Sequence, residues 1–345
     1  MKIAVINSGS SSLKYKLFNL ETLKVLDEVL VENIGEKNAT IKTHEEALAS
    51  INIDYKSLDA IGHRVVHGGE FFKSSVKINE AVISKLKSLI PLAPLHNPAN
   101  IKGIEISLDN ASDVVNIAVF DTAFHATMQK SAFMYALPME MYEKHHIRRY
   151  GFHGTSHSFI SKQAAHELGK DRADTNLITL HLGNGASICA IENGKSIDTS
   201  MGFTPLEGLV MGSRSGDIDP AIVLYMQREL GLSVDEVDKI LNKKSGLLGI
   251  CNENDVRKII ESQDDNARLA LDMMIRRIQK YIGAYMALLG DVDAIVFSGG
   301  IGENSQYIRE KILDSKMFQN IKTLVIKTDE ELEIALECKR VLNGV

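Results

Sequence analysis

Three short apolar runs along the chain each lead directly into a loop that is rich in glycine, serine or both. A short apolar run bounded in this way is typical of a buried β-strand followed by a turn. The pattern therefore predicts three buried strands, each with a polar loop at its end. The runs and their loops are 3–6 with 7–12, 176–180 with 181–187, and 293–297 with 298–304.

Further alternation of apolar and polar residues follows the first two loops. Residues 13–18 alternate and residues 25–34 form another strand-like run, so the first loop is expected to join a β-hairpin. Residues 188–191 repeat this arrangement after the second loop, which indicates an internal duplication. The 345 residues suffice for two domains of about 150 residues each, and the duplication places their boundary near Tyr150.

Helical periodicity fills the intervals between these strands. It predicts helices over 81–89, 156–168, 234–241 and 267–289. The alternation of strands and helices predicts layered α/β domains. In the last helix, apolar residues three and four positions apart form one stripe, which is expected to face the core. The stripe comprises Leu271, Met274, Ile275, Ile278, Ile282, Tyr285, Met286 and Leu289.

Composition and charge exclude several classes of protein. With 39 Lys and Arg against 45 Asp and Glu, the chain has no basic excess for binding a nucleic acid. Cys189, Cys251 and Cys338 lie far apart, which predicts scattered buried thiols rather than a disulfide framework or a zinc site. The first apolar run is too short for a signal peptide and no long apolar stretch follows. We therefore expect a soluble cytoplasmic protein that binds neither nucleic acid nor membrane.

The glycine- and serine-rich loops are candidate phosphate sites. Such turns expose backbone N–H groups and hydroxyls, which are the donors that phosphate oxygens need. The loop at 7–12 alone could be a plain hairpin turn, but the second loop at 181–185 favours phosphate binding. Gly194-Lys195-Ser196 is not a P-loop, because Cys189 stands where the first glycine is required. Residues 299–304 do not match the dinucleotide-binding glycine pattern either, which disfavours a dehydrogenase.

Histidines concentrate in three polar segments, 62–69, 120–125 and 148–157, which hold five of the 11 in the chain. A lone histidine is usually a core or surface residue, but several beside arginine, aspartate and glycine favour a functional role. Their spacing is not that of a zinc site, so Mg²⁺ held by oxygen atoms fits better. Thr155 and Ser156, at the predicted start of a helix, are interpreted as helix caps rather than nucleophiles.

One further loop, 211–220, presents Arg214 between small residues. An arginine in such a loop can bind a transferring phosphoryl group or a carboxylate with two hydrogen bonds. The alternative is an ordinary arginine on a surface loop. The loop alone does not separate the two.

Eight segments, taken together and in order, closely resemble the acetate kinase family, which includes propionate kinases. The resemblance covers nearly the whole chain. The segments are 7–14, 62–69, 92–99, 120–125, 150–157, 181–185, 201–208 and 300–304.

The resemblance implies an α/β fold of duplicated ribonuclease H-like domains, as in the superfamily of actin, sugar kinases and heat-shock ATPases, with the nucleotide in the interdomain cleft. It implies an N-terminal domain over 1–150 on the acyl-substrate side and a C-terminal nucleotide-binding domain over 151–329. The last helix, within 330–345, would pack back on the first domain. A homodimer is also implied.

The activity that the resemblance implies is the reversible transfer of the ATP γ-phosphoryl group to acetate, giving acetyl phosphate and ADP by direct in-line displacement. The partners would be acetate, or another short-chain carboxylate, and ATP, with Mg²⁺ or in its place Mn²⁺. Propionate or butyrate kinase is an alternative within the same family. A nucleotide-binding regulator that has lost transfer activity is an alternative of another class.

By the same resemblance, Asp121, His153 and Arg214 are the catalytic residues, and Arg64 binds the substrate carboxylate. Asn7 and Glu330 contact the metal. Four apolar residues form the pocket for the acyl methyl group: Val66, Leu95, Phe152 and Pro205. The nucleotide contacts are Ser10, Ser12, Lys14, His181, Leu182, Gly183, Asn184, Gly185, Asp255, Arg257, Gly300, Ile301, Gly302, Glu303 and Asn304.

This chain departs from the family pattern in its length. It is several dozen residues shorter, and the losses are expected between Gly35 and Ile61 and between Phe318 and Val325. The second loss affects the segment that joins the adenosine loop to the last strand. Asp329 stands where the family usually has asparagine, so Glu331 competes with Glu330 for the metal role.

Overall fold

The computed structural model describes residues 1–9, 11–35, 39–94 and 96–344. The chain forms two compact units. Unit 1 comprises Met1–Ala126, Gly154–Ser156 and Asp329–Val345, and unit 2 comprises Thr127–His153 and His157–Thr328. Each unit is a group of residues that contact one another more than they contact the rest of the chain. The domain boundaries expected from the sequence stay predictions.

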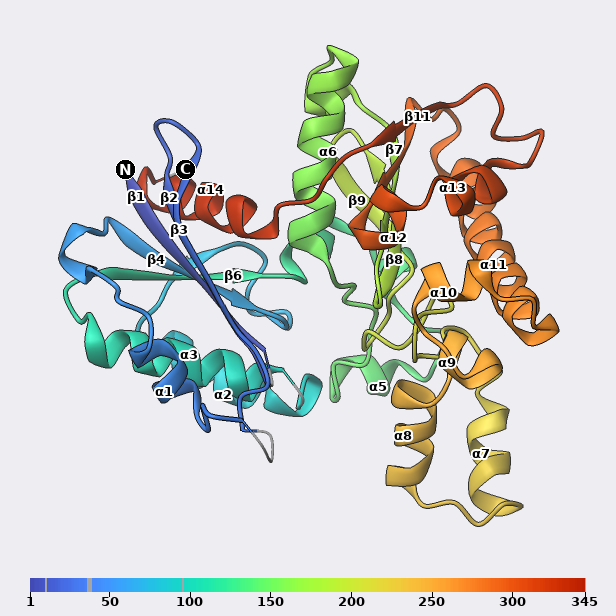
Figure 1. Cartoon of the computed structure of the whole chain (residues 1–345), viewed down its shortest axis with the longest axis horizontal. Helices are drawn as coiled ribbons and strands as arrows, with labels where there is room; N and C mark the ends of the chain where they lie inside the picture. Colours follow the sequence, from blue (N-terminus) through green and yellow to red (C-terminus); the bar gives the residue numbers. More distant parts are fainter. Residues whose placement is uncertain (10, 36–38, 95, 345) are drawn as a thin grey trace. The chain divides into compact units, whose positions relative to one another are not determined.

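Unit 1 contains a six-stranded mixed sheet (Figure 1). The first three strands pair antiparallel, whereas β1, β4 and β6 run parallel to one another. The carboxyl ends of these three parallel strands therefore meet at one edge of the sheet. In spatial order the strands are β3 (Lys24–Val31), β2 (Leu13–Asn19), β1 (Lys2–Ser8), β4 (Ala60–Val65), β6 (Val115–Phe120) and β5 (Val76–Lys77).

The first glycine and serine loop joins a β-hairpin, as predicted. Ser8 pairs with Leu13 across the antiparallel β1 and β2 strands. The Gly9 N–H donates to the Ser12 carbonyl at 2.8 Å, which closes the turn. Ser10 lies outside the described residues.

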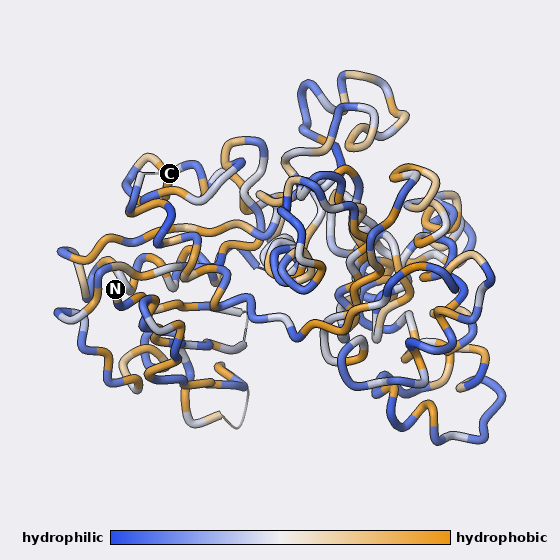
Figure 2. Tube along the Cα trace, turned by 90° about the horizontal axis from the view of Figure 1, so that it is seen from above, coloured by the Kyte–Doolittle hydropathy of each residue, from blue (hydrophilic) through white to orange (hydrophobic). Residues whose placement is uncertain are grey.

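Helices cover both faces of the unit 1 sheet. Alternate residues of β1 point to opposite faces, so the strand contributes to the core on each side. Ala4 and Ile6 pack in a cluster that includes residues of α1 and α3. Ile3 and Val5 pack in a second cluster with Ile334, Ala335 and Cys338 of α14. The apolar run Ile3–Ile6 of β1 is accordingly buried along its length, and Figure 2 shows how apolar and polar stretches alternate along the chain. The helices of unit 1 are α1 (His44–Ala49), α2 (Glu80–Ser88), α3 (Asn97–Asn110) and α14 (Glu330–Leu342), with 3₁₀ turns at Tyr55–Ser57, Ile90–Leu92 and Ala123–Thr127, the last of which ends in unit 2.

Unit 2 repeats this strand arrangement. Three consecutive strands pair antiparallel, and the first of them also runs parallel to β10, which in turn runs parallel to β11. The order matches that of β3, β2, β1, β4 and β6 in unit 1, so the internal duplication is confirmed. In spatial order the strands are β9 (Lys195–Thr199), β8 (Ala186–Glu192), β7 (Leu177–Leu182), β10 (Ala294–Ser298) and β11 (Lys322–Val325).

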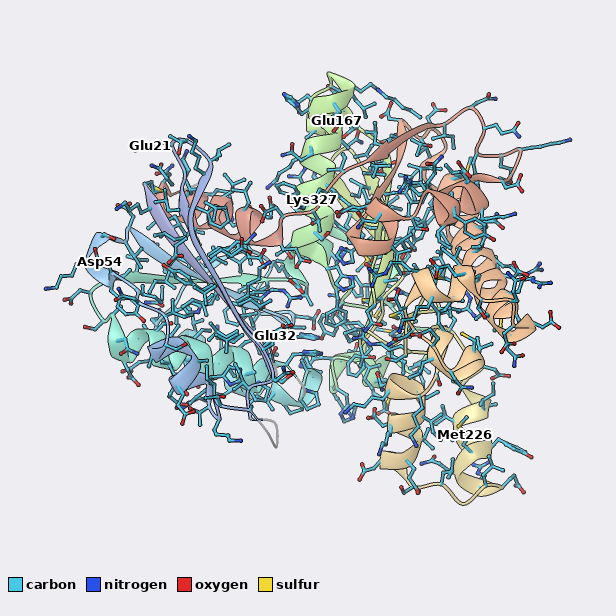
Figure 3. All side chains as sticks on the ribbon, viewed as in Figure 1. Glu21, Glu32, Asp54, Glu167, Met226 and Lys327 are labelled. Atoms are coloured by element: carbon cyan, nitrogen blue, oxygen red, sulfur yellow. The ribbon has the colours of Figure 1, made fainter. Side chains whose placement is uncertain are left out.

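The three helices predicted for unit 2 are confirmed as α6, α8 and α11, whereas its other helices were not predicted. The apolar stripe of α11 is buried as expected, except that Met286 at its edge is half-buried. Charged side chains such as Glu167 project away from the ribbon (Figure 3). The helices are α4 (Lys130–Phe133), α5 (Met139–Glu143), α6 (Gly154–Leu168, whose first three residues cluster with unit 1), α7 (Ala221–Arg228), α8 (Val234–Lys243), α9 (Gly246–Cys251), α10 (Val256–Glu261), α11 (Asp265–Leu289), α12 (Gly299–Asn304) and α13 (Gln306–Leu313), with a 3₁₀ turn at Arg172–Asp174.

The prediction that Thr155 and Ser156 cap a helix is wrong. Helix α6 already begins at Gly154, and its N-cap is His153 in the left-handed conformation, with φ of 56°. Thr155 and Ser156 therefore lie inside the first turn, where their side chains are available for other contacts. Within the described residues, every helix is too short or too polar to cross a membrane.

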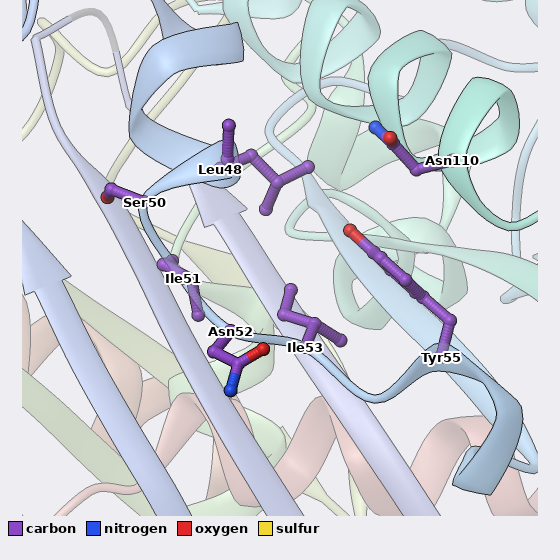
Figure 4. Close-up of a pocket in the computed structure, with 8 residues that line it drawn as sticks. Leu48, Ser50, Ile51, Asn52, Ile53, Tyr55 and Asn110 are labelled. Atoms are coloured by element: carbon purple, nitrogen blue, oxygen red, sulfur yellow. The ribbon is translucent and has the colours of Figure 1, made fainter.

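A hollow of about 310 Å³ opens in unit 1 between the segment that follows α1 and the end of α3 (Figure 4). It is lined by Leu48, Ile53, Tyr55 and Asn110, among others. The hollow lies in the interval between Gly35 and Ile61, where the chain is expected to be short. None of the predicted site residues lines it.

Gly62 lets α14 pack directly on the backbone of β4. A Cβ atom at Gly62 would stand 2.7 Å from Cys338 Sγ and 2.8 Å from Ile334 Cγ2. We expect Gly62→Ala to lower the free energy of unfolding by about 1–3 kcal/mol, the cost of overpacking a core. Urea unfolding monitored by circular dichroism measures this loss.

The matched control is Gly283→Ala in α11, where an added Cβ would meet nothing within 4 Å. Alanine favours a helix over glycine by up to about 1 kcal/mol, so this variant should be as stable as the parent or more stable. Equal stability of the Gly62→Ala variant and the parent would contradict the packing described.

Candidate active site

Three polar side chains gather at the carboxyl edge of the parallel strands in unit 1. Asn7 lies near the end of β1, Arg64 near the end of β4, and Asp121 directly after β6. The guanidinium of Arg64 joins them. Its Nε donates to Asp121 Oδ1 at 3.1 Å, its Nη2 to Asp121 Oδ2 at 2.5 Å, and its Nη1 to Asn7 Oδ1 at 3.4 Å.

Helix α14 brings a second carboxylate to the same place. Glu330 Oε2 lies 3.6 Å from Arg64 Nε. The hydroxyl of Thr155 lies 3.1 Å from Asp121 Oδ1 and 3.1 Å from Glu330 Oε2, so it bridges the two carboxylates. No local sequence pattern indicates this role of Thr155, because its partners are 34 and 175 residues away.

The electrostatics of this cluster favour a bound cation. Burial raises the pKa of Asp121; Arg64 opposes this by stabilising the charged form, but Glu330 raises the pKa further. Burial disfavours the charge on Arg64, yet Asp121 and Glu330 outweigh it and raise the pKa of the guanidinium. The carboxylates of Asp121 and Glu330 and the side-chain carbonyl of Asn7 offer oxygen atoms at this place. These are the ligands that Mg²⁺ prefers, commonly one or two carboxylates supplemented by substrate phosphates, so the residues present fit that ion.

The structure separates Glu330 from its neighbour Glu331. The carboxylate of Glu331 faces β2, where its Oε2 lies 3.0 Å from Lys14 Nζ and 3.6 Å from Lys16 Nζ. Burial disfavours the charge on Lys16, but Asp329 and Glu331 outweigh it and raise its pKa. Glu331 therefore anchors the start of α14 to the hairpin, and Glu330 is the residue that faces Arg64. Lys14, predicted to contact the nucleotide, is engaged in this ion pair.

Two of the five clustered histidines, His63 and His67, are held by hydrogen bonds within unit 1. His63 Nε2 bonds to Asn116 Oδ1 at 2.7 Å, and burial lowers the pKa of its imidazole to about 4. His67 Nδ1 accepts a hydrogen bond from the Gly69 N–H at 3.0 Å. Asn97 and Asn100 of α3 accept from the N–H groups of His67 and Val66 and so hold the segment that follows Arg64.

In unit 2, the predicted phosphate loop is the turn between β7 and β8. The Gly183 N–H donates to the Gly185 carbonyl at 3.1 Å, and the Asn184 carbonyl accepts from the Gly212 N–H at 3.0 Å. The ring of His181, at the end of β7, lies 4.4 Å from the ring of His153. The hydrogen bond from Gly212 to Asn184 connects this turn to the loop that carries Arg214.

Gly185 keeps a space open between Arg214 and His153. A Cβ atom at Gly185 would stand 3.5 Å from Arg214 Nη1 and 3.6 Å from His153 Nε2. Arg214 Nη1 also donates to the Pro205 carbonyl at 3.1 Å. Burial lowers the pKa of this guanidinium, which means that an anion beside it would stabilise its charge.

Residues of α11 support the loop that carries Arg214. Asp217 accepts from the Gly208 N–H at 2.8 Å and from the Tyr281 hydroxyl at 2.8 Å. Arg277 Nη1 donates to the Gly208 carbonyl at 2.8 Å. No local sequence pattern indicates these supports, because they connect the loop to a helix 60 to 69 residues further along.

The third glycine loop forms α12, directly after β10. A Cβ atom at Gly299 would stand 2.7 Å from the Leu182 carbonyl oxygen, so α12 begins beside the end of β7. Glu303 Oε1 accepts from the N–H groups of Gly299 and Thr328, and Asn304 Nδ2 donates to the Gly300 carbonyl. Ile301 and Gly302 lie in the same helix.

The remaining predicted site residues are placed as follows. Asp255 caps α10 and forms an ion pair of 2.7 Å with the exposed Arg257, so the hydrogen bonds of this pair are local. Val66 and Ser12 belong to unit 1, and Phe152 and Pro205 to unit 2. Leu95, like Ser10, lies outside the described residues.

A model of the acetokinase family matches residues 2–56 and 45–342. The chain belongs to the acetokinase family. An acetate kinase from Sulfurimonas denitrificans is 55% identical to it over the full length of both chains. The crystal structure of Porphyromonas gingivalis acetate kinase covers 99% of each chain, with a TM-score of 0.92 and 40% identity. That of a propionate kinase from Francisella tularensis covers 97% of this chain and 98% of the other, with a TM-score of 0.93 and 43% identity.

Membership of the acetokinase family confirms the predicted family, enzyme class and duplicated α/β fold. The alignment with the Sulfurimonas acetate kinase runs over 389 positions, more than the 345 residues of this acetokinase. The relative therefore carries several dozen residues that are missing here. The two parts of the family match overlap at 45–56, within the interval where the first loss is expected.

Proposed function

We propose that this acetokinase transfers the γ-phosphoryl group of ATP to acetate, giving acetyl phosphate and ADP in a reversible in-line displacement. The observation that carries the proposal is the space at Gly185, which Arg214 and His153 flank. Glycine, arginine and histidine in that arrangement supply the room and the donors that a transferring phosphoryl group needs. Full-length similarity to acetate kinases supports the same reaction.

The carboxylate of the acyl substrate is proposed to bind to Arg64 of unit 1. Arg64 is held by two hydrogen bonds to Asp121, which fixes the direction of its guanidinium for a carboxylate ligand. Acetate is ionised at neutral pH because carboxylic acids titrate near about 4, so no general base is needed. The role proposed for Asp121 is therefore to orient Arg64 and the metal rather than to remove a proton. Val66, Leu95, Phe152 and Pro205 are proposed to contact the acyl methyl group.

The proposed nucleotide contacts belong mainly to unit 2. Residues 181–185 are proposed to bind the phosphate chain, and Asp255, Arg257 and residues 300–304 the adenosine. Ser10, Ser12 and Lys14 are the proposed contacts from unit 1. For Lys14 this would require the ammonium group to leave Glu331 or to be shared with it.

Asn7, Asp121 and Glu330 are proposed to hold Mg²⁺, or Mn²⁺ in its place. When bound, such an ion neutralises charge on the phosphate oxygens. Two observations support this assignment. The three side chains offer oxygen ligands, and the negative charges of Asp121 and Glu330 repel each other unless a cation neutralises them. Because Glu331 is paired with Lys14 and Lys16, Glu330 is the preferred ligand.

Acetyl phosphate formation tests the proposed reaction. With purified protein and Mg-ATP, we expect acetate to give the highest rate of acyl phosphate, trapped as the hydroxamate, in parallel assays with propionate and butyrate. Arg214→Ala should lower kcat by about 10³ to 10⁵, as the loss of an arginine that contacts the transferring group does. The control is Arg268→Ala, an exposed arginine of α11, which should retain the rate.

The same assay decides among the alternatives. Similarity to the Francisella propionate kinase favours propionate as the second candidate, and one methylene changes selectivity by only about 1–3 kcal/mol. A higher rate with propionate or butyrate would replace acetate as the substrate. ATP binding without turnover of any carboxylate would contradict the kinase proposal and favour a regulator.

The metal assignment predicts different effects of the two neighbouring glutamates. Glu330→Gln and Asp121→Asn should raise the Mg²⁺ concentration for half-maximal rate by about tenfold or more, because each removes one charged oxygen ligand. Glu331→Gln should change that concentration much less and should instead lower stability, since it breaks a largely buried ion pair. Steady-state rates over a Mg²⁺ titration measure this. An equal increase with Glu331→Gln would make Glu331 the ligand.

We also propose a homodimer that acts in the cytoplasm. Five exposed apolar side chains surround α7 and the start of α8, and a second copy would cover them. Cys189 and Cys338 are buried thiols that form no disulfide, which suits a reducing compartment, and kinase activity in a membrane or exported fraction of cells would contradict that location. The five apolar residues are Ile222, Leu224, Tyr225, Leu230 and Val234.

Analytical ultracentrifugation tests the dimer. We expect the parent to sediment as a dimer and Tyr225→Glu as a monomer, because a charge would be buried in the interface. Leu26→Glu places the same charge at an exposed apolar position of β3 and should stay dimeric. A monomeric parent, or a dimeric Tyr225→Glu variant, would contradict the proposed interface.

A further inference from the structure

Two histidines four residues apart, His153 and His157, are joined through the hydroxyl group of Ser187. His153 Nδ1 lies 2.9 Å from Ser187 Oγ, and His157 Nε2 lies 2.8 Å from the same oxygen. On its other side, His157 Nδ1 lies 2.8 Å from Thr179 Oγ1. The four groups form one continuous chain from β7 through α6 and β8 to the N-cap of α6, and we call it the histidine relay.

The inner part of the histidine relay is shielded from water. Thr179, His157 and Ser187 each have 0% exposure, whereas His153 at its end is half-buried beside Gly185. Polar groups buried in this way are stable only if every donor meets an acceptor. The sequence alone predicts no specific role for any of the three buried members.

Counting protons restricts the relay to two states when both histidines are neutral. A neutral imidazole donates from one nitrogen and accepts at the other, and a hydroxyl has a single proton to donate. A hydroxyl can also accept two hydrogen bonds, but within the described residues the Ser187 hydroxyl contacts only these two nitrogens, so accepting from both would leave its buried proton without an acceptor. Ser187 therefore donates to one histidine and accepts from the other. The three hydrogen bonds consequently all point toward His153 or all point away from it.

The proposed function selects the direction. A phosphoryl oxygen only accepts hydrogen bonds, so His153 Nε2, which lies on the side of Gly185, must carry a proton to bind it. In a neutral ring this leaves Nδ1 as the acceptor. Ser187 then donates to His153, His157 Nε2 donates to Ser187, and Thr179 donates to His157 Nδ1.

A neutral donor also suits the surroundings of His153. Arg214 Nη1 approaches the same Gly185 position to 3.5 Å, and the ring of His181 lies 4.4 Å from that of His153. A charged imidazolium at this point would repel the guanidinium while no phosphate is bound. A neutral N–H group offers the hydrogen bond without that repulsion.

We propose that Thr179, His157 and Ser187 are positioning residues that hold His153 in the neutral tautomer with its proton on Nε2. The inference rests on the proposed function, and it identifies how one residue of that site is prepared for the phosphoryl group. His153 then donates to the phosphoryl oxygen without first being protonated. Within the histidine relay, Ser187 is the residue that hydrogen-bonds to both rings.

Nitrogen-15 NMR of the full-length protein, labelled at histidine, tests the tautomer directly. At about pH 8, above the ordinary imidazole pKa of about 6.5, the His153 signals should show a proton on Nε2 and none on Nδ1. His153→Gln assigns them by their loss. In Ser187→Ala the Nδ1–H tautomer should appear, and kcat should fall about tenfold, the effect of one hydrogen bond, with KM for acetate nearly unchanged.

Two further variants control for structural damage. Ser161→Ala removes another fully buried hydroxyl of α6 that lies outside the relay and bonds to the Ser158 carbonyl, and it should alter neither the signals nor kcat. His157→Gln keeps a side-chain N–H that can donate to Ser187, so it should preserve the tautomer that His157→Leu loses. This pair also serves if Ser187→Ala does not fold.

Each outcome decides something different. A proton on Nδ1 of His153 in the parent, or unchanged signals and kcat in Ser187→Ala, would overturn the inference while leaving kinase activity intact. A parent that forms no acyl phosphate would instead refute the proposed function. The NMR signals still report the direction of the relay in that case.

Discussion

The ion pair between Arg64 and Asp121 is the interaction on which the unit 1 site depends. Asp121 is buried, and its two oxygens each receive a hydrogen bond from the guanidinium. Removing either partner would leave an uncompensated charge in a poorly solvated place. The pair forms because β4 and β6 run parallel and end at the same edge. Glu330, Thr155 and Asn7 are then arranged around a guanidinium that is already fixed.

Helix α14 connects this site to the core of the unit. It lies on β4 so closely that only glycine fits at position 62, and its first turn is anchored by Glu331 to Lys14 and Lys16. Packing thus sets the position of the helix, and the ion pairs set the rotation of its first turn. Together they direct Glu330, rather than its neighbour, toward Arg64. A structural role for Glu331 follows from the same geometry.

In unit 2, hydrogen bonds position the loop that carries Arg214 and the ring of His153. Asp217, Arg277 and Tyr281 hold the base of the loop that carries Arg214. The histidine relay holds His153 from the other side. Positioning of this kind suits phosphoryl transfer, where the protein chiefly orients groups and neutralises charge. These supports hold the hydrogen-bond donors beside Gly185 in place, so the donors need not reorganise when a phosphoryl group is transferred.

The sequence by itself determined the strands, their glycine loops, the duplication and the long helices, since apolar periodicity and turn chemistry act between near neighbours. Motif similarity likewise identified the family and most candidate site residues. The tertiary structure alone decided that Glu330 rather than Glu331 faces Arg64, that Thr155 bridges two carboxylates, and that Ser187 joins two histidines. These contacts, together with the ion pair of Glu331 and Lys14, link residues 30 to 317 positions apart. Which side chains meet over such separations depends on how whole elements pack, and no local pattern encodes that.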